Sequence, residues 1–222
     1  MQKPMVFDES LVHSVKVNRN AVEARASTLG TRRTFKNESQ VAALIRTVEC
    51  IDLTTLQGDD TPGKILRLCA KALRPVDRET LSALGVDRDI RVGAVCVFHD
   101  MIDPAARALR GKVPIAAVST GFPVGLSPMT TRLQEIDWSI CAGATEIDVV
   151  VSRHLVLGGK WSDLYAEIKR FREVCGDRAK MKTILGVGNL GTLENVAKAS
   201  RVAIMAGSDF IKTSTGFEPT NA

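Results

Sequence analysis

The sequence predicts an α/β domain in which short parallel strands alternate with amphipathic helices. Six segments rich in valine and isoleucine have the length and composition of strands that are covered on both faces of a parallel sheet. The composition does not break between them, which favours one domain at residues 37–222. Residues 1–36 lack a strong period and are expected to form a mobile or loosely docked extension. In chain order, the expected strands are residues 48–53, 90–97, 115–119, 146–151, 181–185 and 209–213.

Capping residues and glycines predict where the helices begin and end. Asn37 is expected to cap the first clear helix, with Gln40 able to reach back to it. Ser127 and Pro128 are expected to open a helix before the fourth strand, and Ser162 to open one before the fifth. The expected helix ends are Gly143, Gly176 and Gly207.

Composition and charge argue against several classes of protein. The formal net charge is +5, but 30 basic residues are scattered among 25 acidic ones, and aromatic residues make up 5% of the chain. A base-stacking surface for nucleic acid is therefore not expected, whereas a mild excess of cations suits an anionic, phosphorylated substrate. No apolar run approaches the length of about 20 residues that spans a membrane, so no membrane partner is expected.

The cysteines argue against a metal centre and against a disulfide framework. They are widely spaced, and they form no C-x-x-C pair and no cluster with histidine. Free thiols in a chain without a recognisable signal peptide are typical of a reducing compartment, so a cytoplasmic location is expected. The five cysteines are Cys50, Cys69, Cys96, Cys141 and Cys175.

The strand pattern alone leaves two architectures open, a doubly wound sheet and a barrel. No Gly-x-Gly-x-x-Gly follows an early strand, as a dinucleotide-binding sheet would require. Two stretches, AGATEIDVVV at 142–151 and AGSDFIKTST at 206–215, repeat the order of helix end, glycine, short strand and polar residue. This repetition favours a (β/α) barrel, whose chemistry lies at the carboxyl ends of its strands.

Four residues at the expected strand ends form the candidate site: Asp52, Cys96, Asp148 and Lys212. A lysine in a barrel mouth is expected to lose its proton readily, and its neutral amine can attack an aldehyde to form an imine. Structural roles remain as alternatives: Asp148 as the counter-ion of Lys212, Asp52 as the cap of a turn, and Cys96 as a small core residue. The grouping of all four at strand ends favours catalysis.

Six motifs, in order, resemble the successive signatures of deoxyribose-phosphate aldolases of the animal type. They are IDLTTLQGDDT, AVCV, GFPVG, GATEIDVV, KTIL with LGTL, and AGSDFIKTSTG, and they extend from about residue 48 to residue 222. The resemblance implies a (β/α)8 barrel of the TIM type and a lyase of deoxyribonucleotide catabolism. Its reaction would be the reversible cleavage of 2-deoxy-D-ribose 5-phosphate to acetaldehyde and D-glyceraldehyde 3-phosphate, with no metal or organic cofactor. The ordered set of motifs disfavours a transaldolase.

The resemblance also implies roles for residues of this sequence. Carried over by position, Lys212 would form the Schiff base, and Asp148 would act as the acid and base that moves a proton through water. Lys182, on the preceding strand, is expected to lie near the substrate and to favour the neutral amine of Lys212 by like-charge repulsion. The other expected substrate-binding residues are Asp52, Cys96, Thr213 and Gly216.

The sequence departs from the family pattern toward its C-terminus. Family members continue into a seventh strand with a second lysine in a Gly-Phe-Lys-Pro motif and into an eighth strand, whereas this sequence stops at Ala222. About six βα units of a truncated barrel are therefore expected, with the last two strands missing and open edges on the first and sixth strands. Phe217 also stands where the family has a lysine, and Asn189 where it has a glutamate. His99, in a loop, is expected to be solvated.

Two functions follow as alternatives. The first is an active Schiff-base aldolase for a small phosphorylated sugar. The second is a catalytically impaired chain that binds or regulates a full-length aldolase through its open strand edges. The same edges make homo-oligomer formation an expected mode of association.

Overall fold

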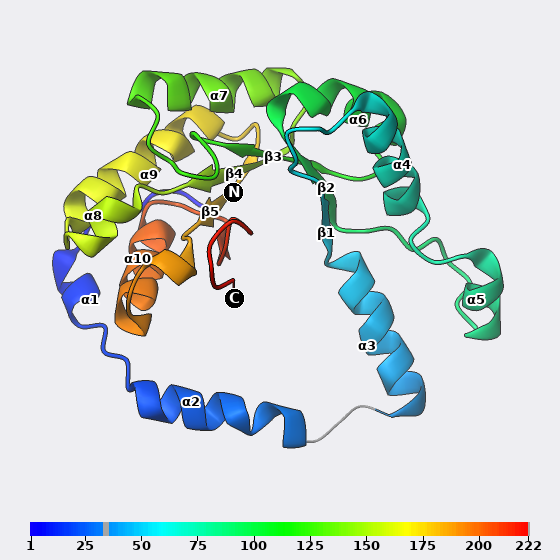
Figure 1. Cartoon of the computed structure of the whole chain (residues 1–222), viewed down its shortest axis with the longest axis horizontal. Helices are drawn as coiled ribbons and strands as arrows, with labels where there is room; N and C mark the ends of the chain where they lie inside the picture. Colours follow the sequence, from blue (N-terminus) through cyan, green and yellow to red (C-terminus); the bar gives the residue numbers. More distant parts are fainter. Residues whose placement is uncertain (33–35, 222) are drawn as a thin grey trace. The chain divides into compact units, whose positions relative to one another are not determined.

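The computed structural model describes residues 1–32 and 36–221, and the chain divides into two compact units. The larger unit comprises Met1–Thr31, Val118–Cys141 and Glu146–Ala222, and the smaller unit comprises Arg32–Ala117 and Ala142–Thr145. Parallel strands with intervening helices build both units, as Figure 1 shows. The expected α/β class is therefore confirmed.

The smaller unit holds the first strands of the chain. Strand β1 (Asp52–Thr54) pairs in parallel with β2 (Ala94–Val97), which pairs in parallel with β3 (Ile115–Ser119). The part of β3 up to Ala117 belongs to this unit. Helix α4 packs against α6 and against β2. The helices of this unit are α3 (Asn37–Glu49), α4 (Pro62–Leu73), α5 (Arg78–Ala83) and α6 (Ile102–Leu109), with the 3-10 turn η2 (His99–Met101).

The larger unit holds β4 (Glu146–Val150), β5 (Lys180–Ile184) and β6 (Phe210–Lys212), which pair in that order and in parallel. Helix α7 packs against β4, α9 against β5 and α10 against β6. Buried apolar side chains from strands and helices form its core, among them Ile147, Val149, Leu164, Ile168, Phe171 and Met181. The helices are α1 (Glu9–His13), α2 (Arg19–Ser27), α7 (Met129–Cys141), α8 (Arg153–Leu157), α9 (Trp161–Cys175) and α10 (Leu193–Met205), with the 3-10 turns η1 (Leu29–Thr31) and η3 (Val187–Asn189).

Strand β3 has the expected bounds, β4 ends one residue early, and β5 and β6 each differ from expectation by one residue at both ends. The expected strand at 90–97 is shorter than predicted, because β2 begins only at Ala94. The expected strand at 48–53 is wrong in its first half, because α3 continues to Glu49. Val48 extends the helical spacing that begins at Val41, which explains why the helix continues there. The expected cap at Asn37 is also wrong: Asn37 is the first residue of α3, with a φ of +50°, and Lys36 precedes it without a side-chain cap.

The N-terminal segment of the larger unit docks on α9 and α10. The Met5 N–H donates a hydrogen bond to the Met205 carbonyl at 2.7 Å, and the Gln2 N–H donates to Asp209 Oδ1 at 2.8 Å. The ring centroid of Phe7 lies 5.1 Å from that of Tyr165. The expected boundary between extension and domain lies next to residues 33–35, which fall outside the described residues, so this division stays a prediction.

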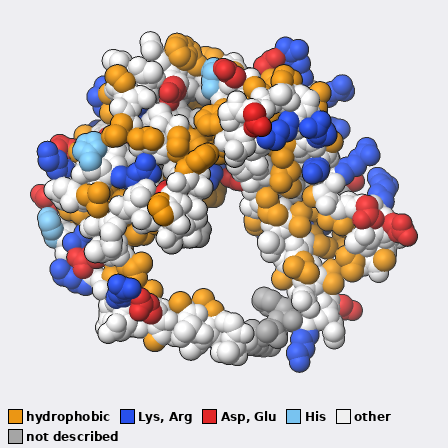
Figure 2. Space-filling view, in the orientation of Figure 1, with side chains coloured by type: hydrophobic (Ala, Val, Ile, Leu, Met, Phe, Trp, Pro, Cys, Tyr) orange, Lys and Arg blue, Asp and Glu red, His pale blue; other side chains and the backbone are white. Residues whose placement is uncertain are grey.

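Charge and hydropathy of the described residues complete the description. On the face that Figure 2 draws, Lys and Arg side chains lie dispersed among Asp and Glu side chains, without one continuous basic patch on that face. Within the described part of the chain, no helix has both the length and the apolar character needed to cross a membrane.

Candidate active site

Strands β4, β5 and β6 place four charged side chains on one face of their sheet. Glu146 and Asp148 are two residues apart in β4, so both side chains point to the same side. Asp148 is in register with Lys182 of β5, and Ile184, two residues further, is in register with Lys212 of β6. Residues in register on neighbouring parallel strands share a face, so both lysines point to the side of the two carboxylates.

The four side chains form a continuous chain of ion pairs. Lys212 Nζ donates a hydrogen bond to Asp148 Oδ2 at 2.5 Å. Lys182 Nζ lies 3.5 Å from Asp148 Oδ1 and 2.7 Å from Glu146 Oε2. Asp148 thus stands between two ammonium groups, and Lys182 stands between two carboxylates.

Because these charged side chains are largely buried, each of them requires an oppositely charged partner. The side chain of Asp148 is fully buried, that of Lys182 is 8% exposed, and that of Lys212 is 28% exposed. A buried charge costs several kcal/mol unless it is paired, and here two carboxylates face two ammonium groups. Lys212 is the most exposed of these three side chains, and its role as the reacting amine stays a prediction.

A second buried network fixes the carboxyl end of β4. Arg132 Nη2 donates to the carbonyl of Val150 at 3.0 Å, while its Nη1 donates to Glu167 Oε2 at 2.9 Å. Glu167 Oε1 in turn accepts the N–H of Ser152 at 2.8 Å. The strand that carries Asp148 is therefore anchored to α7 at its last residue, Val150, and to α9 just beyond it.

The loop after β6 is held by Glu218. Its carboxylate accepts the N–H groups of Thr215, at 3.0 and 3.1 Å, and of Gly216, at 3.2 Å. Burial raises the pKa of Glu218, but these hydrogen bonds outweigh burial and hold it below its ordinary value. Thr213 is exposed, and its carbonyl accepts the Val187 N–H at 2.9 Å. Thr213 and Gly216 thus lie in the loop directly after Lys212, and their contact with substrate stays a prediction.

Asp52 and Cys96 lie in the smaller unit, on one face of the β1–β2 pair. Asp52 is in register with Ala94, two residues before Cys96, so both side chains point to the same side. Cys96 is fully buried and Asp52 is half-buried. The expectation that these two residues join Lys212 around one substrate stays a prediction.

A cavity of about 300 Å³ lies beyond the carboxyl ends of β1 and β2. It is lined by the half-buried His99 and by the buried Asp60, whose Oδ1 lies 2.5 Å from Lys64 Nζ. Burial raises the pKa of Asp60, but hydrogen bonds from Lys64, the Gln57 N–H and Thr55 outweigh it and lower that pKa. His99 is therefore more enclosed than the sequence suggested.

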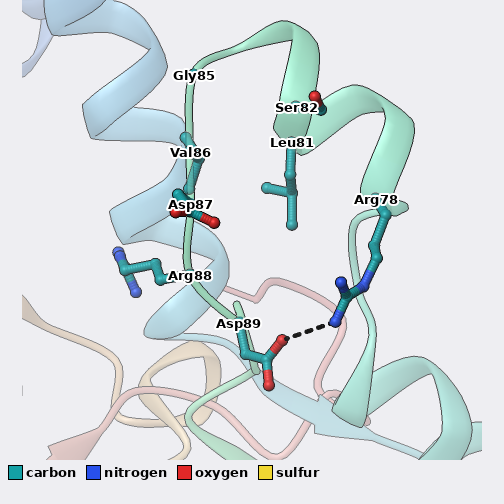
Figure 3. A pocket seen from close by; sticks show the side chains of 8 residues that line it. All are labelled: Arg78, Leu81, Ser82, Gly85, Val86, Asp87, Arg88 and Asp89. Atoms are coloured by element: carbon teal, nitrogen blue, oxygen red, sulfur yellow. Dashed lines mark ion pairs between the residues drawn. The ribbon is translucent and has the colours of Figure 1, made fainter.

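Another pocket of the smaller unit lies away from the strand ends. Helix α5 and the loop after it enclose about 660 Å³, and Figure 3 shows Arg78 and Asp89 pointing toward one another across its mouth. Their ion pair measures 3.8 Å between Arg78 Nη2 and Asp89 Oδ1. No strand residue lines this pocket, so it is not the candidate active site.

Sequence reasoning identified three of the four residues of the charged chain and gave the fourth no role. Glu146 lies in the GATEIDVV motif, two residues before Asp148. Two acidic residues at alternate positions of an apolar strand were the signal that could have identified it. Its pairing with Lys182 depends on the β4–β5 register, which the sequence does not reveal. Among the described residues, no group of three or more His, Cys, Asp or Glu side chains is arranged to hold a metal ion.

Comparisons with known proteins agree with the geometry of the strands. The family described as DeoC/LacD family aldolase matches residues 47–222. The deoxyribose-phosphate aldolase of Bos taurus is 50% identical over 225 residues, which cover 100% of this chain and 70% of the relative. The deoxyribose-phosphate aldolase of Homo sapiens is 51% identical over 220 residues, which cover 97% of this chain and 69% of the relative.

Solved structures show the same fold. The aldolase QR15 has a TM-score of 0.66 and 27% identity, with 79% of this chain and 71% of that chain covered. The tetrameric deoxyribose phosphate aldolase of Aeropyrum pernix has a TM-score of 0.63 and 23% identity, with 78% and 66% covered. The strand order, the family match and the relatives agree: the chain belongs to the DeoC/LacD family of aldolases.

Proposed function

We propose that the chain is a Schiff-base aldolase that reversibly cleaves 2-deoxy-D-ribose 5-phosphate, in deoxyribonucleotide catabolism. The observation that carries the proposal is the 2.5 Å contact between Lys212 Nζ and the buried carboxylate of Asp148. It brings the amine needed for nucleophilic catalysis within one hydrogen bond of a group that can accept its proton. The relatives that share half of their residues with this chain bear the name of this activity.

The proposed reaction begins when the Lys212 proton passes to Asp148 and the neutral amine adds to the aldehyde carbon C1 of the sugar. Loss of water gives a protonated imine. The C3 hydroxyl then loses its proton, and the C2–C3 bond breaks. Its electron pair moves into the imine to form an enamine, and D-glyceraldehyde 3-phosphate leaves. Protonation of the enamine carbon restores the imine, and water releases acetaldehyde and Lys212.

The other predicted residues have supporting roles in this proposal. Lys182 supplies a fixed positive charge beside Asp148, at 3.5 Å. The loop after β6 contributes Thr213 and Gly216 to the substrate side, and the smaller unit contributes Asp52 and Cys96. No observation favours the alternative of a non-catalytic partner of a longer aldolase.

The test is a cleavage assay with 2-deoxy-D-ribose 5-phosphate that measures acetaldehyde release. Lys212→Met keeps the length of the side chain and removes the amine, so kcat is expected to fall by about a thousandfold or more. Lys169→Met, which changes an exposed lysine of α9, is the matched control and is expected to keep full activity. Equal rates for the wild type and Lys212→Met would refute the role of Lys212.

We also infer a reducing compartment such as the cytoplasm, and self-association. Three of the five cysteines are buried, which suits a compartment without oxidising chemistry. Cell fractionation tests the location, and sedimentation of the purified chain tests the oligomeric state.

A further inference from the structure

We propose that Glu146 is a positioning residue that holds Lys182 away from Asp148 and so keeps Asp148 available to Lys212. The inference deepens the proposed aldolase function and rests on it for its catalytic consequence. Glu146 makes its 2.7 Å ion pair with Lys182, so it acts through Lys182.

The distances show a competition for Lys182. Its ammonium group lies 2.7 Å from Glu146 Oε2 but 3.5 Å from Asp148 Oδ1, a separation longer than a good charge-assisted hydrogen bond. Lys212, in contrast, lies 2.5 Å from the other oxygen of Asp148. Glu146 therefore takes the short contact with Lys182, and Asp148 gives its own short contact to Lys212.

Because these side chains are buried, the carboxylate with which Lys182 pairs strongly affects the charge around Asp148. The side chains of Glu146 and Lys182 are 11% and 8% exposed, so water screens neither charge well. Without the Glu146 charge, the nearest carboxylate for Lys182 is Asp148, on the in-register position of the neighbouring strand. A Lys182 that closes on Asp148 stabilises that group as a carboxylate and makes it a poorer acceptor of the Lys212 proton.

The same rearrangement has the opposite effect on Lys212. Asp148 faces Lys182 from β5 and Lys212 from β6, and Glu146 lies on its own strand. If a closer Lys182 shares Asp148, Lys212 loses part of the negative charge that stabilises its ammonium form. The removal of the Glu146 charge also makes that ammonium form less stable. The amine of Lys212 then loses its proton more easily, so it reacts faster with a simple acylating reagent.

Four variants test the proposal: Glu146→Gln, Glu146→Asp, Lys182→Met and the double variant Glu146→Gln/Lys182→Met. The readouts are kcat and KM for cleavage, the rate of deuterium transfer from solvent into the methyl group of acetaldehyde, and the rate of trace acetylation of Lys212 by acetic anhydride. Glu194→Gln is the matched control, because it removes a carboxylate 2.6 Å from Lys198 on the surface of α10.

For Glu146→Gln we expect kcat and deuterium transfer to fall about tenfold, with KM within about twofold, since proton transfer is impaired and binding is not. Acetylation of Lys212 is expected to rise about threefold. Glu146→Asp should recover part of the lost rate. In the double variant, Lys212 should be acetylated at the wild-type rate, because Lys182 no longer competes with it for Asp148. A drop in both the reaction rate and the acetylation rate would indicate simple loss of structure and would overturn the proposal.

The outcomes separate this inference from the proposed function. If the wild type cleaves the sugar and Glu146→Gln behaves like the wild type in every readout, the inference fails while the function stands. If the wild type neither cleaves the sugar nor exchanges the methyl protons of acetaldehyde, the proposed function fails. The acetylation of Lys212 then still decides whether Glu146 controls the amine through Lys182.

Discussion

Asp148 is the residue on which the electrostatics of the site depend. It is fully buried, and its carboxylate faces the ammonium groups of Lys212 and Lys182. An unpaired carboxylate at this depth would be strongly unfavourable, so both lysines stabilise it. The same pairing places the Lys212 proton one hydrogen bond away from a group that can receive it. Asp148 therefore has a structural role and a proposed catalytic role.

The first prediction concerns Asp148→Asn. An amide cannot accept the Lys212 proton or return one to an enamine, so kcat should fall by about a hundredfold to ten-thousandfold. Deuterium transfer into acetaldehyde, followed by NMR, should fall in parallel. Asp137→Asn is the control, because Asp137 forms an exposed ion pair with Arg178 at 2.7 Å in the same unit. Unimpaired deuterium transfer in a folded Asp148→Asn variant would contradict the acid–base role.

Asp209 has a structural role that depends on pH. Burial raises its pKa, but the N–H groups of Met181 and Gln2 and the guanidinium of Arg172 outweigh burial and hold the pKa below the ordinary value of 3.8. A carboxyl group whose pKa is lower in the folded state than in the unfolded state stabilises the fold at pH values above its unfolded-state pKa. That contribution is lost as the pH falls from about 3.8 through the folded-state value.

The second prediction concerns Asp209→Asn. At pH 7 the change breaks a buried pair of 2.8 Å with Arg172, and the free energy of unfolding should fall by about 3 kcal/mol. The variant should also lose less stability than the wild type when the pH is lowered from 5 to below about 3.8. Urea unfolding at several pH values measures both effects.

The control is Asp103→Asn, which removes an exposed ion pair with Arg107 and should lower the free energy of unfolding by less than about 1 kcal/mol. Equal losses in the two variants would contradict this account.

At the scale of elements, the strands with a clear valine and isoleucine pattern were predictable and the ends of α3 were not. Strand β3 matched its expected bounds, because apolar residues fill its first four positions, with Pro114 before it and Thr120 after it. The boundary between α3 and β1 was misplaced, because β-branched residues near 48 suit a strand locally, while the helical spacing from Val41 to Val48 decides the structure.

The candidate site was predictable in part for a related reason. Asp148 and Lys212 interrupt apolar strands, and such interruptions are visible in the sequence. The choice of Glu146 as the short-range partner of Lys182 was not visible, since it depends on strand register and on a difference of less than an ångström between two distances. Register is a property of the assembled sheet, and single-sequence patterns do not specify it.

The third prediction concerns the turn after β5. Gly186 has a φ of +67°, and a Cβ there would lie 2.7 Å from Arg153 Nη1 and 2.9 Å from Glu218 Oε1. Gly191 has a similar φ of +76° but nothing within 4 Å of its Cβ position. Gly186→Ala should therefore destabilise the protein by about 2 kcal/mol, and Gly191→Ala by about 1 kcal/mol, since only the first adds a steric clash to the backbone strain. Thermal unfolding compares them, and a more destabilising Gly191→Ala would contradict this assignment.

At the scale of the whole molecule, the proposed nucleophile and its proton acceptor lie in one unit. The larger unit contains the complete chain of ion pairs from Glu146 to Lys212, so the nucleophile and its proton acceptor are held within one packed body. The N-terminal segment belongs to this unit as well, and its hydrogen bonds to Asp209 and Met205 lie at the opposite end of β6 from Lys212. The proposed role of Lys212 is therefore argued from groups that all lie in the larger unit.

The measurement that tests the central claim most directly is borohydride trapping with acetaldehyde, read by intact mass and peptide mapping. Reduction of an imine leaves an ethyl group on the amine that formed it. We predict a single ethyl adduct on Lys212 in the wild type and none at that position in Lys212→Met. An adduct on a different lysine, or no adduct in a folded sample, would contradict the assignment of Lys212 as the Schiff-base lysine.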